Sequence, residues 1–194
     1  ITSHEITARL LDVATVLKTA QAIASEIEMD RLLEQVMGIV LTNSGAQRAV
    51  LTMASRDEDE SGTPKANPEL SLVIVAIATV EQEAARTGLS IHLDATSREA
   101  SASVIGFVAN TRQTLISSNP HEDPKFVADP YLQTHKPRSI LALPLLHQKK
   151  LTGVMVLENG IIQDAFTQER VDLLHLLCSQ VAIALENARL YERI

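Results

Sequence analysis

Apolar residues in the first 28 positions recur at alternating intervals of four and three residues. The series consists of Ile6, Leu10, Val13, Leu17, Ala20, Ala24 and Ile27. A mean spacing of roughly 3.5 residues is the heptad pattern of helices that supercoil around another helix. We therefore predict that residues 1–28 form a helix that contacts a partner helix. The alternative is an apolar stripe that faces the core of its own domain.

The following segment predicts a second helix and then two strands. Asp30 can cap the helix at its start, and Gly45 can end it in the left-handed conformation. The runs 46–54 and 70–80 are rich in Val, Ile and Leu, which favours strands. Between them, residues 55–69 are charged and contain Gly and Pro, so they predict a long surface connection.

Shorter elements are predicted in the middle of the chain. Apolar and polar residues alternate over residues 89–93, the pattern of a strand with one solvated face. A helix over 101–111 and a short strand over 115–118 follow. Residues 119–138 contain four prolines and predict short helices and loops that cover one face of a sheet.

The segment "SILALPLLHQKKLTGVMVLEN", residues 139–159, predicts an antiparallel pair of strands that turns at residues 148–150. Pro144 interrupts the first of these strands. Because proline has no N–H to donate to a strand ladder, we expect a bulge or an unpaired position there.

The last helix is predicted to begin after Thr167 and carries two apolar stripes. One stripe consists of Val171, Leu174, Cys178, Val181, Leu185 and Ala188, and the other of Leu173, Leu177, Ala184, Tyr191 and Ile194. A helix that lies on a sheet needs only one stripe, so the second is predicted to meet a partner helix. The expected dimer contacts are Ile6, Leu10, Val13, Leu17, Leu177, Ala184 and Tyr191.

The composition narrows the class of protein. The formal charge is −7, from 17 Lys and Arg against 24 Asp and Glu, so nucleic acid is not an expected partner. A single cysteine forms no internal disulfide, which fits a reducing compartment such as the cytoplasm. The strand-like apolar run 72–80 is shorter than a membrane span, so no membrane segment is predicted. The helical pattern continues to Ile194 without a cap, and we therefore expect the chain to be part of a longer protein.

Motifs for catalysis or metal binding are not found in the sequence. Neither a phosphate-cradling glycine loop nor a G-x-S-x-G nucleophile elbow occurs, so we do not expect an enzyme. His175 and Cys178 lie three residues apart, but their apolar helical setting favours a core role over a nucleophilic pair. His121 and His135, with the acidic residues nearby, match no known metal-ligand spacing, so no metal is predicted.

The segment 119–138 and its edge supply the candidate ligand site. Its residues are Phe126, Tyr131, His135 and Ser139. Apolar walls with a few converging polar groups are typical of small-molecule pockets. The alternative is that the aromatic side chains only pack the covering segment onto the sheet.

Three segments of the sequence resemble a known family. The segment 139–159 followed by "AFTQERVDLLHLLCSQVAIALENARLYE" is similar to the C-terminal half of a GAF domain, and "LDVATVLKTAQAIASEIEMDRLLEQVMGIVLTNSGAQRAVL" to its opening helices and first strand. "FVADPYLQTHKPRS" resembles the segment before the fifth strand. The resemblance is greatest to GAF domains of cyanobacterial multi-sensor histidine kinases.

The resemblance implies an α+β fold, with a six-stranded antiparallel sheet between a layer that contains both terminal helices and a layer of short helices and loops. It also implies a division into an N-terminal dimerisation helix (1–28), a GAF domain (29–190) and a C-terminal helix (167–194) that continues toward an output domain. These elements agree with the α+β order derived from the hydrophobic pattern.

The departures from the family narrow the choice of ligand. The signature of members that bind cyclic nucleotides is not found, and the only cysteine lies on the last helix, away from where bilins are attached. Methionine sulfoxide reductases of this fold need several cysteines. Cyclic nucleotides and bilins are therefore disfavoured, and the cofactor is left open.

Two functions stay open from the sequence. The first is a sensor that passes a small-molecule or conformational signal to neighbouring kinase domains through a homodimer of terminal helices. The second is a dimerisation and spacer module that binds no ligand.

Overall fold

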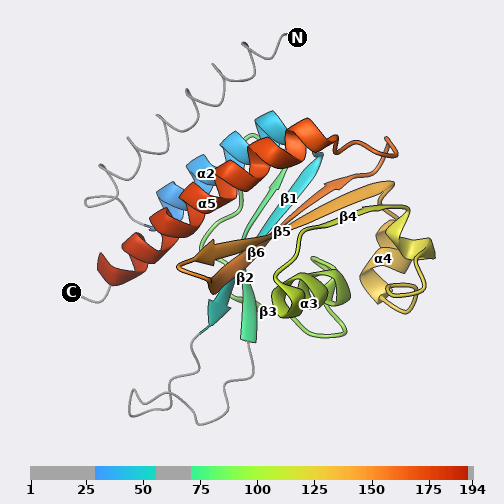
Figure 1. Cartoon of the computed structure of the whole chain (residues 1–194), viewed down its shortest axis with the longest axis horizontal. Helices are drawn as coiled ribbons and strands as arrows, with labels where there is room; N and C mark the ends of the chain where they lie inside the picture. The colour runs from blue at the N-terminus through green and yellow to red at the C-terminus, as the bar shows by residue number, and fades with distance from the viewer. Residues whose placement is uncertain (1–28, 56–70, 192–194) are drawn as a thin grey trace.

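The computed structural model describes residues 29–55 and 71–191, which contain one antiparallel sheet of six strands (Figure 1). The strand order is β3-β2-β1-β6-β5-β4, so β1 and β6 are central. The strands are β1 (Arg48–Ser55), β2 (Ser71–Thr79), β3 (Ile91–His92), β4 (Leu115–Ser118), β5 (Ser139–His147) and β6 (Lys150–Asn159).

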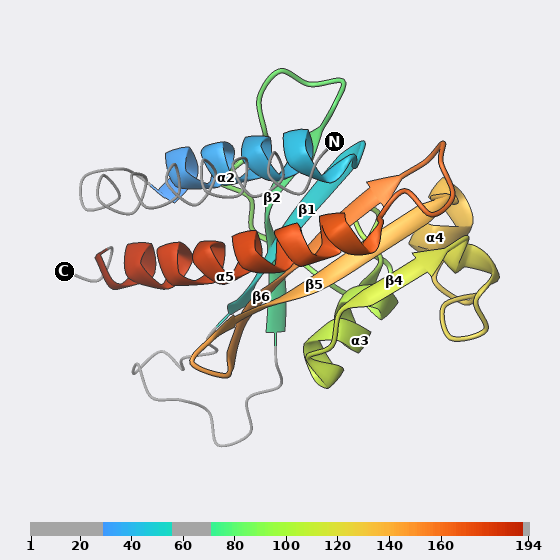
Figure 2. The ribbon, with the colours of Figure 1, turned by 45° about the horizontal axis from the view of Figure 1, so that its top comes forward.

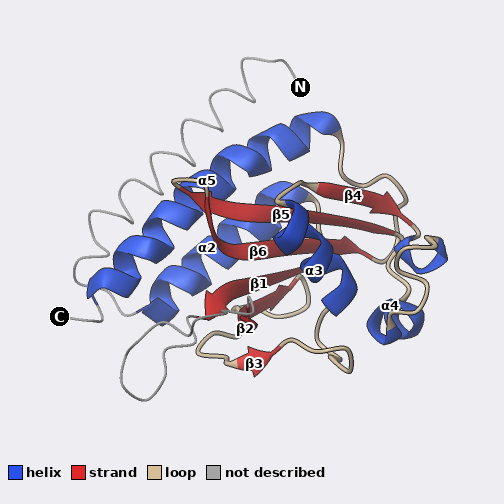
Figure 3. Cartoon of the chain, turned by 60° about the horizontal axis from the view of Figure 1, so that its bottom comes forward, coloured by secondary structure: helices blue, strands red, loops and turns tan. Residues whose placement is uncertain are grey.

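Helices cover both faces of this sheet (Figure 3). One face carries the long helices α2 (Met29–Ser44) and α5 (Gln168–Tyr191). The other carries α3 (Ala102–Thr111), the short 3₁₀ helix η1 (Pro120–Glu122) and α4 (Pro130–His135). The predicted α+β architecture with an antiparallel sheet between two helical layers is confirmed.

The alternation of side chains along β5 produces the two cores. Leu141 and Leu143 pack toward α2 and α5, whereas Ile140 and Ala142 pack toward α3 and α4. All four are completely buried, as is expected of a central strand covered on both faces.

The two central strands approach each other closely at Gly153. A Cβ atom at this position would lie 2.0 Å from the backbone oxygen of Thr52, so only glycine fits. The Thr52 hydroxyl accepts a hydrogen bond from the Val154 N–H and donates one to the Val154 carbonyl, both at 3.1 Å. This contact fixes the pairing of β1 with β6 in the middle of the sheet.

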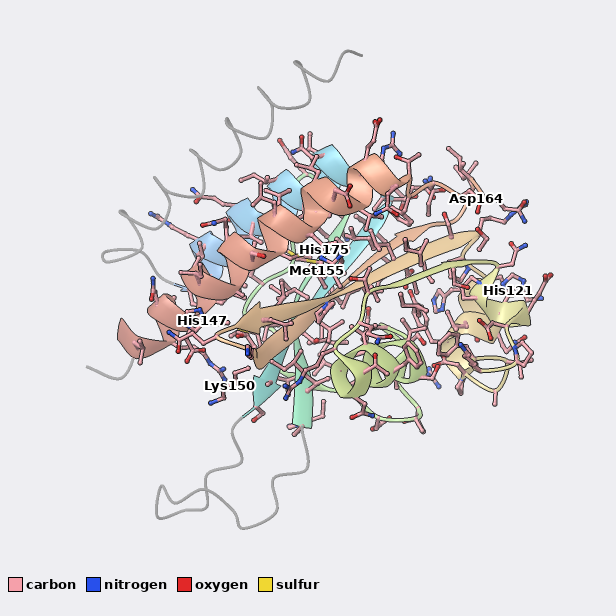
Figure 4. All side chains as sticks on the ribbon, viewed as in Figure 1. His121, His147, Lys150, Met155, Asp164 and His175 are labelled. Carbon is pink, nitrogen blue, oxygen red and sulfur yellow. The ribbon has the colours of Figure 1, made fainter. Side chains whose placement is uncertain are left out.

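The hairpin between β5 and β6 turns at Gln148 and Lys149, one residue shorter than predicted, because Lys150 already belongs to β6. Gln148 and Lys149 have φ values of 50° and 65°, the left-handed conformation of a two-residue turn. His147 and Lys150 flank it at the tip (Figure 4). Pro144 pairs with β6 in register. The strand shifts register two positions later, between Leu145 and Leu146, and β4 pairs with β5 only as far as Ala142. Pro144 therefore lies beyond the end of the β4–β5 pairing, where no β4 residue needs a hydrogen bond from its nitrogen.

Helices α2 and α5 lie side by side on the sheet (Figure 2). The predicted first stripe of α5 is buried, as expected for a helix on a sheet. Two residues assigned to the dimer stripe, Leu177 and Ala184, are only 2% and 1% exposed within this one chain. The prediction that they face a second copy is wrong, because α2 lies beside α5 and helps to fill that stripe. The side chain of Tyr191 and the positions Ile6, Leu10, Val13 and Leu17 lie outside the described residues.

Several element boundaries differ from the sequence prediction. Helix α2 begins at Met29, so Asp30 lies inside its first turn and does not cap it. Only two of the residues 89–93 are in β3. Helix α5 begins just after Thr167, as predicted, and the Val171 N–H donates to the Thr167 carbonyl. By length and composition α5 could cross a membrane, but half of the relevant window is buried in the fold, as in a core helix.

Candidate functional site

The face of the sheet beneath α3 and α4 holds three of the four predicted site residues. Phe126 is 2% exposed and forms an edge contact with Phe107 of α3, with ring centroids 5.9 Å apart. The Lys125 ammonium lies 5.5 Å from the centre of the Phe107 ring, a cation–π distance. Phe126 therefore holds the segment before α4 against α3.

Tyr131 and His135 come together on one face of α4 because they are four residues apart. Their rings stack with centroids 4.2 Å apart and an interplanar angle of 25°. The His135 ring is exposed, whereas Tyr131 is buried beneath it. The Tyr131 hydroxyl donates a 2.8 Å hydrogen bond to Oε2 of Glu158 in β6.

Glu158 is the centre of a buried polar cluster that the sequence analysis did not identify. It lies opposite Arg48 of β1 in the strand pairing, so both side chains lie on the α3/α4 face. Burial raises the pKa of Glu158, although the hydrogen bond from Tyr131 and the charge of Arg48 partly oppose this. The sequence did contain a signal for this cluster, namely a glutamate inside the apolar run "VMVLEN". A charged residue in a buried strand needs a partner, so such a glutamate indicates a polar cluster.

Arg48 extends the cluster toward the segment before α3. One of its terminal nitrogens donates to the Glu99 carbonyl oxygen and lies 3.2 Å from the Glu99 carboxylate. Burial by itself would lower the pKa of Arg48, but the neighbouring Tyr131 and Glu158 and the hydrogen bond with Glu99 outweigh it and raise the pKa. The guanidinium is therefore held in its charged form between the sheet and this covering segment.

Asp129 ties the two covering helices together. It is the N-cap of α4, and its Oδ1 accepts from the Leu132 N–H. Its Oδ2 accepts from the hydroxyls of Ser101 and Ser103 and from the Ser103 N–H, where Ser101 is the N-cap of α3. Burial would raise the pKa of Asp129, but these hydrogen bonds prevail and hold it below the ordinary value.

Ser139 is not part of this cluster. It precedes Ile140, whose side chain faces α3 and α4, and successive strand residues point to opposite faces. The Ser139 hydroxyl instead donates a 2.8 Å hydrogen bond to the Ile162 carbonyl in the β6–α5 connection. Its role is to hold that connection, so its grouping with the aromatic residues is corrected.

The other candidate groups lie apart from one another. Cys178 is buried, and burial raises the pKa of its thiol to about 12, far from the value of a nucleophile. His175 is exposed on α5, and its Nε2 forms a 2.9 Å hydrogen bond with the Thr114 hydroxyl. His121 lies in η1 beside α4, away from His175 on α5 (Figure 4). Within residues 29–55 and 71–191, no group of three or more His, Cys, Asp or Glu side chains could hold a metal ion.

Comparisons with known proteins agree with this architecture. The family profile described as "GAF domain" matches residues 28–185. The chain is 37% identical over 92 residues to hybrid signal transduction histidine kinase G of Dictyostelium discoideum, which covers 47% of this chain and 3% of that protein. It is 27% identical over 187 residues to peroxide stress-activated histidine kinase mak3 of Schizosaccharomyces pombe, which covers 95% of this chain and 7% of that protein. The chain therefore spans only a small part of the length of these kinases.

A solved structure shares the fold over almost the whole length. It is the GAF domain from Acinetobacter phosphoenolpyruvate-protein phosphotransferase, at a TM-score of 0.64 and 18% identity, covering 98% of this chain and 97% of that chain. At this identity the likeness concerns the fold alone.

Proposed function

The chain belongs to the GAF domain family, and we propose that it is a non-catalytic regulatory domain of a signalling histidine kinase. Its role would be to pass a small-molecule or conformational signal to neighbouring domains of the same chain through paired terminal helices. The two kinase relatives support this context. The cytoplasmic location and the cyanobacterial multi-sensor type of parent are part of the proposal.

The observation that carries the proposal is a row of exposed or half-buried residues on the outer side of α5, of which only Leu173 also packs against the chain's own core. The row, named here the α5 seam, consists of Leu173, Leu176, Gln180, Ile183, Asn187 and Leu190. The intervals are three and four residues in alternation, the heptad spacing of a helix that packs against another helix. Leu176 and Leu190 are 44% and 55% exposed, which is unusual for leucines in a helix that also serves the core.

We assign the α5 seam to a second copy of the chain. Gln180 and Asn187 lie one heptad apart at equivalent positions of the seam. A polar residue at such a position fixes register and oligomer state in paired helices, at a cost in stability. In a parallel pair of α5 helices, each of these residues faces the identical residue of the other copy, so their amides satisfy one another. The seam replaces Leu177 and Ala184 as the α5 contribution, and the predicted N-terminal contacts at Leu10 and Leu17 stay part of the proposal.

A paired helix is a physical route for a signal because it has more than one arrangement of similar energy. A ligand or neighbouring domain shifts the balance only by its differential affinity for the two arrangements. In this chain α5 rests on the sheet through one side and would rest on its copy through the α5 seam. A change on the α3/α4 side of the sheet would therefore have to reach α5 through β5 and β6.

The test is the oligomeric state of the chain in analytical ultracentrifugation. We expect a dimer at micromolar concentration, and a monomer when Leu176→Asp and Ile183→Asp are combined, because two carboxylates would be buried in the seam. Ser179→Asp is the matched control, since this exposed residue lies on α5 but outside the seam. Leu10→Asp with Leu17→Asp tests the N-terminal contacts in the same way. A wild-type monomer, or a seam variant that dimerises like the control, would refute the proposed packing.

The second candidate function is a spacer that dimerises without a ligand. The dense packing of Phe126 and Leu132, 2% and 0% exposed, favours this reading of the α3/α4 side. A thermal-shift screen against metabolites separates the two functions, since a ligand at 100 times its dissociation constant adds about 2.7 kcal/mol to the stability of the folded state. A spacer would show no shift with any compound.

A further inference from the structure

Three apolar side chains at one end of the sheet are largely exposed to solvent. Ile161, Val80 and Ile162 are 70%, 58% and 56% exposed, the highest values of any large apolar residue within 29–55 and 71–191. Single exposed apolar residues are common on protein surfaces, whereas a group of them marks a contact with another molecule. The meaning of these three residues therefore depends on whether they lie together.

The strand pairing brings the three residues to one place. Val80 follows the end of β2, and its N–H donates to the Gln47 carbonyl at 2.9 Å. The Gln47 side chain accepts from the Gly160 N–H at 2.8 Å, one residue before Ile161. Because β1 lies between β2 and β6 and neighbouring strands are roughly 4.8 Å apart, the main chains of Val80 and Gly160 are about 10 Å apart. We name Val80, Ile161 and Ile162 the rim patch.

The main chain beneath the two isoleucines is held by side chains from the sheet. Asn159, at the end of β6, is 4% exposed, and its Oδ1 accepts from the N–H groups of Ile161 and Ile162 at 2.9 and 2.8 Å. Its Nδ2 donates to the Gly45 carbonyl at 3.0 Å, and the Ser139 hydroxyl holds the Ile162 carbonyl from β5. The β6–α5 connection therefore presents both isoleucines in a fixed position beyond the strand ends (Figure 2). A contact that is fixed in advance loses little entropy on binding.

The charges beside the rim patch are mainly negative. Three exposed carboxylates border it, and none forms an ion pair with a described residue: Glu81, Glu83 and Asp164 (Figure 4). Arg170, at the start of α5, adds one positive charge, and its guanidinium donates to the Ala165 carbonyl at 2.8 Å. Arg138 precedes Ser139, so strand alternation turns its side chain toward α3 and α4 and away from the connection. A negative border favours a partner that carries positive charge.

The same charges disfavour two other occupants. A second copy related by a two-fold axis would bring the carboxylates of both copies into one interface, and anionic lipid head groups would meet them as well. A protein segment with apolar residues flanked by Lys or Arg avoids both repulsions. A helix also has a suitable length, because two turns rise about 11 Å, close to the separation across β1.

We infer that the rim patch is the docking surface for a basic amphipathic helix from a neighbouring domain of the same signalling protein. Its apolar residues would contact Val80 and the two isoleucines, and its Lys or Arg would lie beside Glu81 and Glu83. The inference rests on the proposed function, which supplies the neighbouring domains. The chain spans only 3% and 7% of its two kinase relatives, so most of such a protein lies outside it. The connection leads directly into α5, and docking there would restrain the start of that helix.

The test titrates the whole chain with a synthetic peptide of lysine and leucine, about 18 residues long so that it can form a helix in water. Its leucines occupy one apolar stripe, and the matched control peptide has glutamate at every lysine position. The readout is the set of backbone amide signals in nuclear magnetic resonance. We expect the signals of the rim patch to shift, with a dissociation constant on the order of 0.1 mM, as a few buried side chains would give. The glutamate peptide should bind at least about tenfold more weakly.

Variants assign the binding to the rim patch. Ile161→Ser combined with Ile162→Ser should weaken binding of the lysine peptide at least about tenfold, because the isoleucines no longer add apolar burial. Both side chains are exposed in the free chain, so the thermal unfolding of this variant should match wild type. Val127→Ser is the matched control, since Val127 is 51% exposed in the segment before α4. Glu81→Gln combined with Glu83→Gln should weaken binding roughly threefold or more and reduce its dependence on salt.

Four results would overturn the inference: no shift at the rim patch with the lysine peptide, equal binding of the two peptides, equal binding by the isoleucine variant and Val127→Ser, or a dimer that the isoleucine variant turns into a monomer in ultracentrifugation. In the last case a second copy covers the patch. A monomer that binds the lysine peptide at the rim patch would refute the α5 seam and leave this inference standing. A dimer that depends on the α5 seam but does not bind the peptide would do the reverse.

Discussion

The two faces of the sheet differ in what they bury. The face beneath α2 and α5 is filled by aliphatic side chains from β5 and the helices. The face beneath α3 and α4 also contains Asp129 and Glu158, both of the carboxyl groups that are buried among the described residues. A face without buried charge responds mainly to changes of volume, whereas a face with buried charge also responds to protons and to polar molecules. The fold thus separates a packing surface from a chemically sensitive one.

The largest difference should be seen by removing volume from the packing face. Leu174→Ala in α5 deletes a side chain that is 0% exposed, and we expect a loss of about 2–5 kcal/mol in the free energy of unfolding. Leu176→Ala, two residues away and 44% exposed, should change the stability of a monomer by less than about 0.5 kcal/mol. Urea unfolding of both variants measures the difference. Equal losses would mean that α5 is not divided into a core side and an outer side.

The face beneath α2 and α5 could largely be predicted from the sequence, because its apolar residues recur at regular intervals. The first stripe of α5, the β5–β6 hairpin and the left-handed stop at Gly45 all follow from spacing and residue type. The misassigned pair Leu177 and Ala184 shows the limit of this reasoning. Spacing tells that a second stripe exists, but it does not tell that α2 of the same chain fills it, since this depends on how the two helices meet in space.

The sensitive face could be predicted only in part, because its contacts join residues that are far apart in the sequence. Tyr131 and His135 were identified together, since four residues along a helix bring side chains to one side. Arg48 and Glu158 are 110 positions apart and meet only through the pairing of β1 with β6. Ser139 was grouped wrongly because a strand residue next to the site points to the opposite face.

The two buried carboxyl groups should respond to acid in opposite directions. The pKa of Asp129 is lowered in the fold, so its contribution to stability is present above the ordinary value of 3.8 and is lost as the pH falls through the lowered pKa. The pKa of Glu158 is raised, so the folded state takes up its proton first. The wild-type chain therefore gains stability from this group as the pH falls through the raised pKa toward 4.5.

Two variants make this contrast measurable. Asp129→Asn should lose about 1–3 kcal/mol at neutral pH, because the charged acceptor of the α3–α4 contacts is gone, and the gap from wild type should narrow as the pH falls below 3.8. Relative to Glu158→Gln, the wild type should become more stable as the pH is lowered toward 4.5. Urea unfolding across a pH series provides both curves, with Asp172→Asn on the exposed side of α5 as the control. If the stability difference between wild type and variant changed with pH in the same direction for both variants, the two carboxyl groups would not be distinct in this way.

The smallest expected difference in stability is between variants of two histidines, His135 on α4 and His175 on α5. His135 and His175 are both exposed and each makes one hydrogen bond through its ring, but only His135 also stacks on a buried ring. His135→Ala should therefore cost about 0.5–1.5 kcal/mol, the usual value of an aromatic pair beyond its buried area, and His175→Ala less than about 0.5 kcal/mol. His135→Phe keeps a ring over Tyr131 and should recover most of the loss in thermal unfolding. Phenylalanine keeps the ring but lacks the ring nitrogen that bonds the Tyr131 carbonyl. If His135→Phe is as unstable as His135→Ala, this hydrogen bond and not the stacking holds the two rings together.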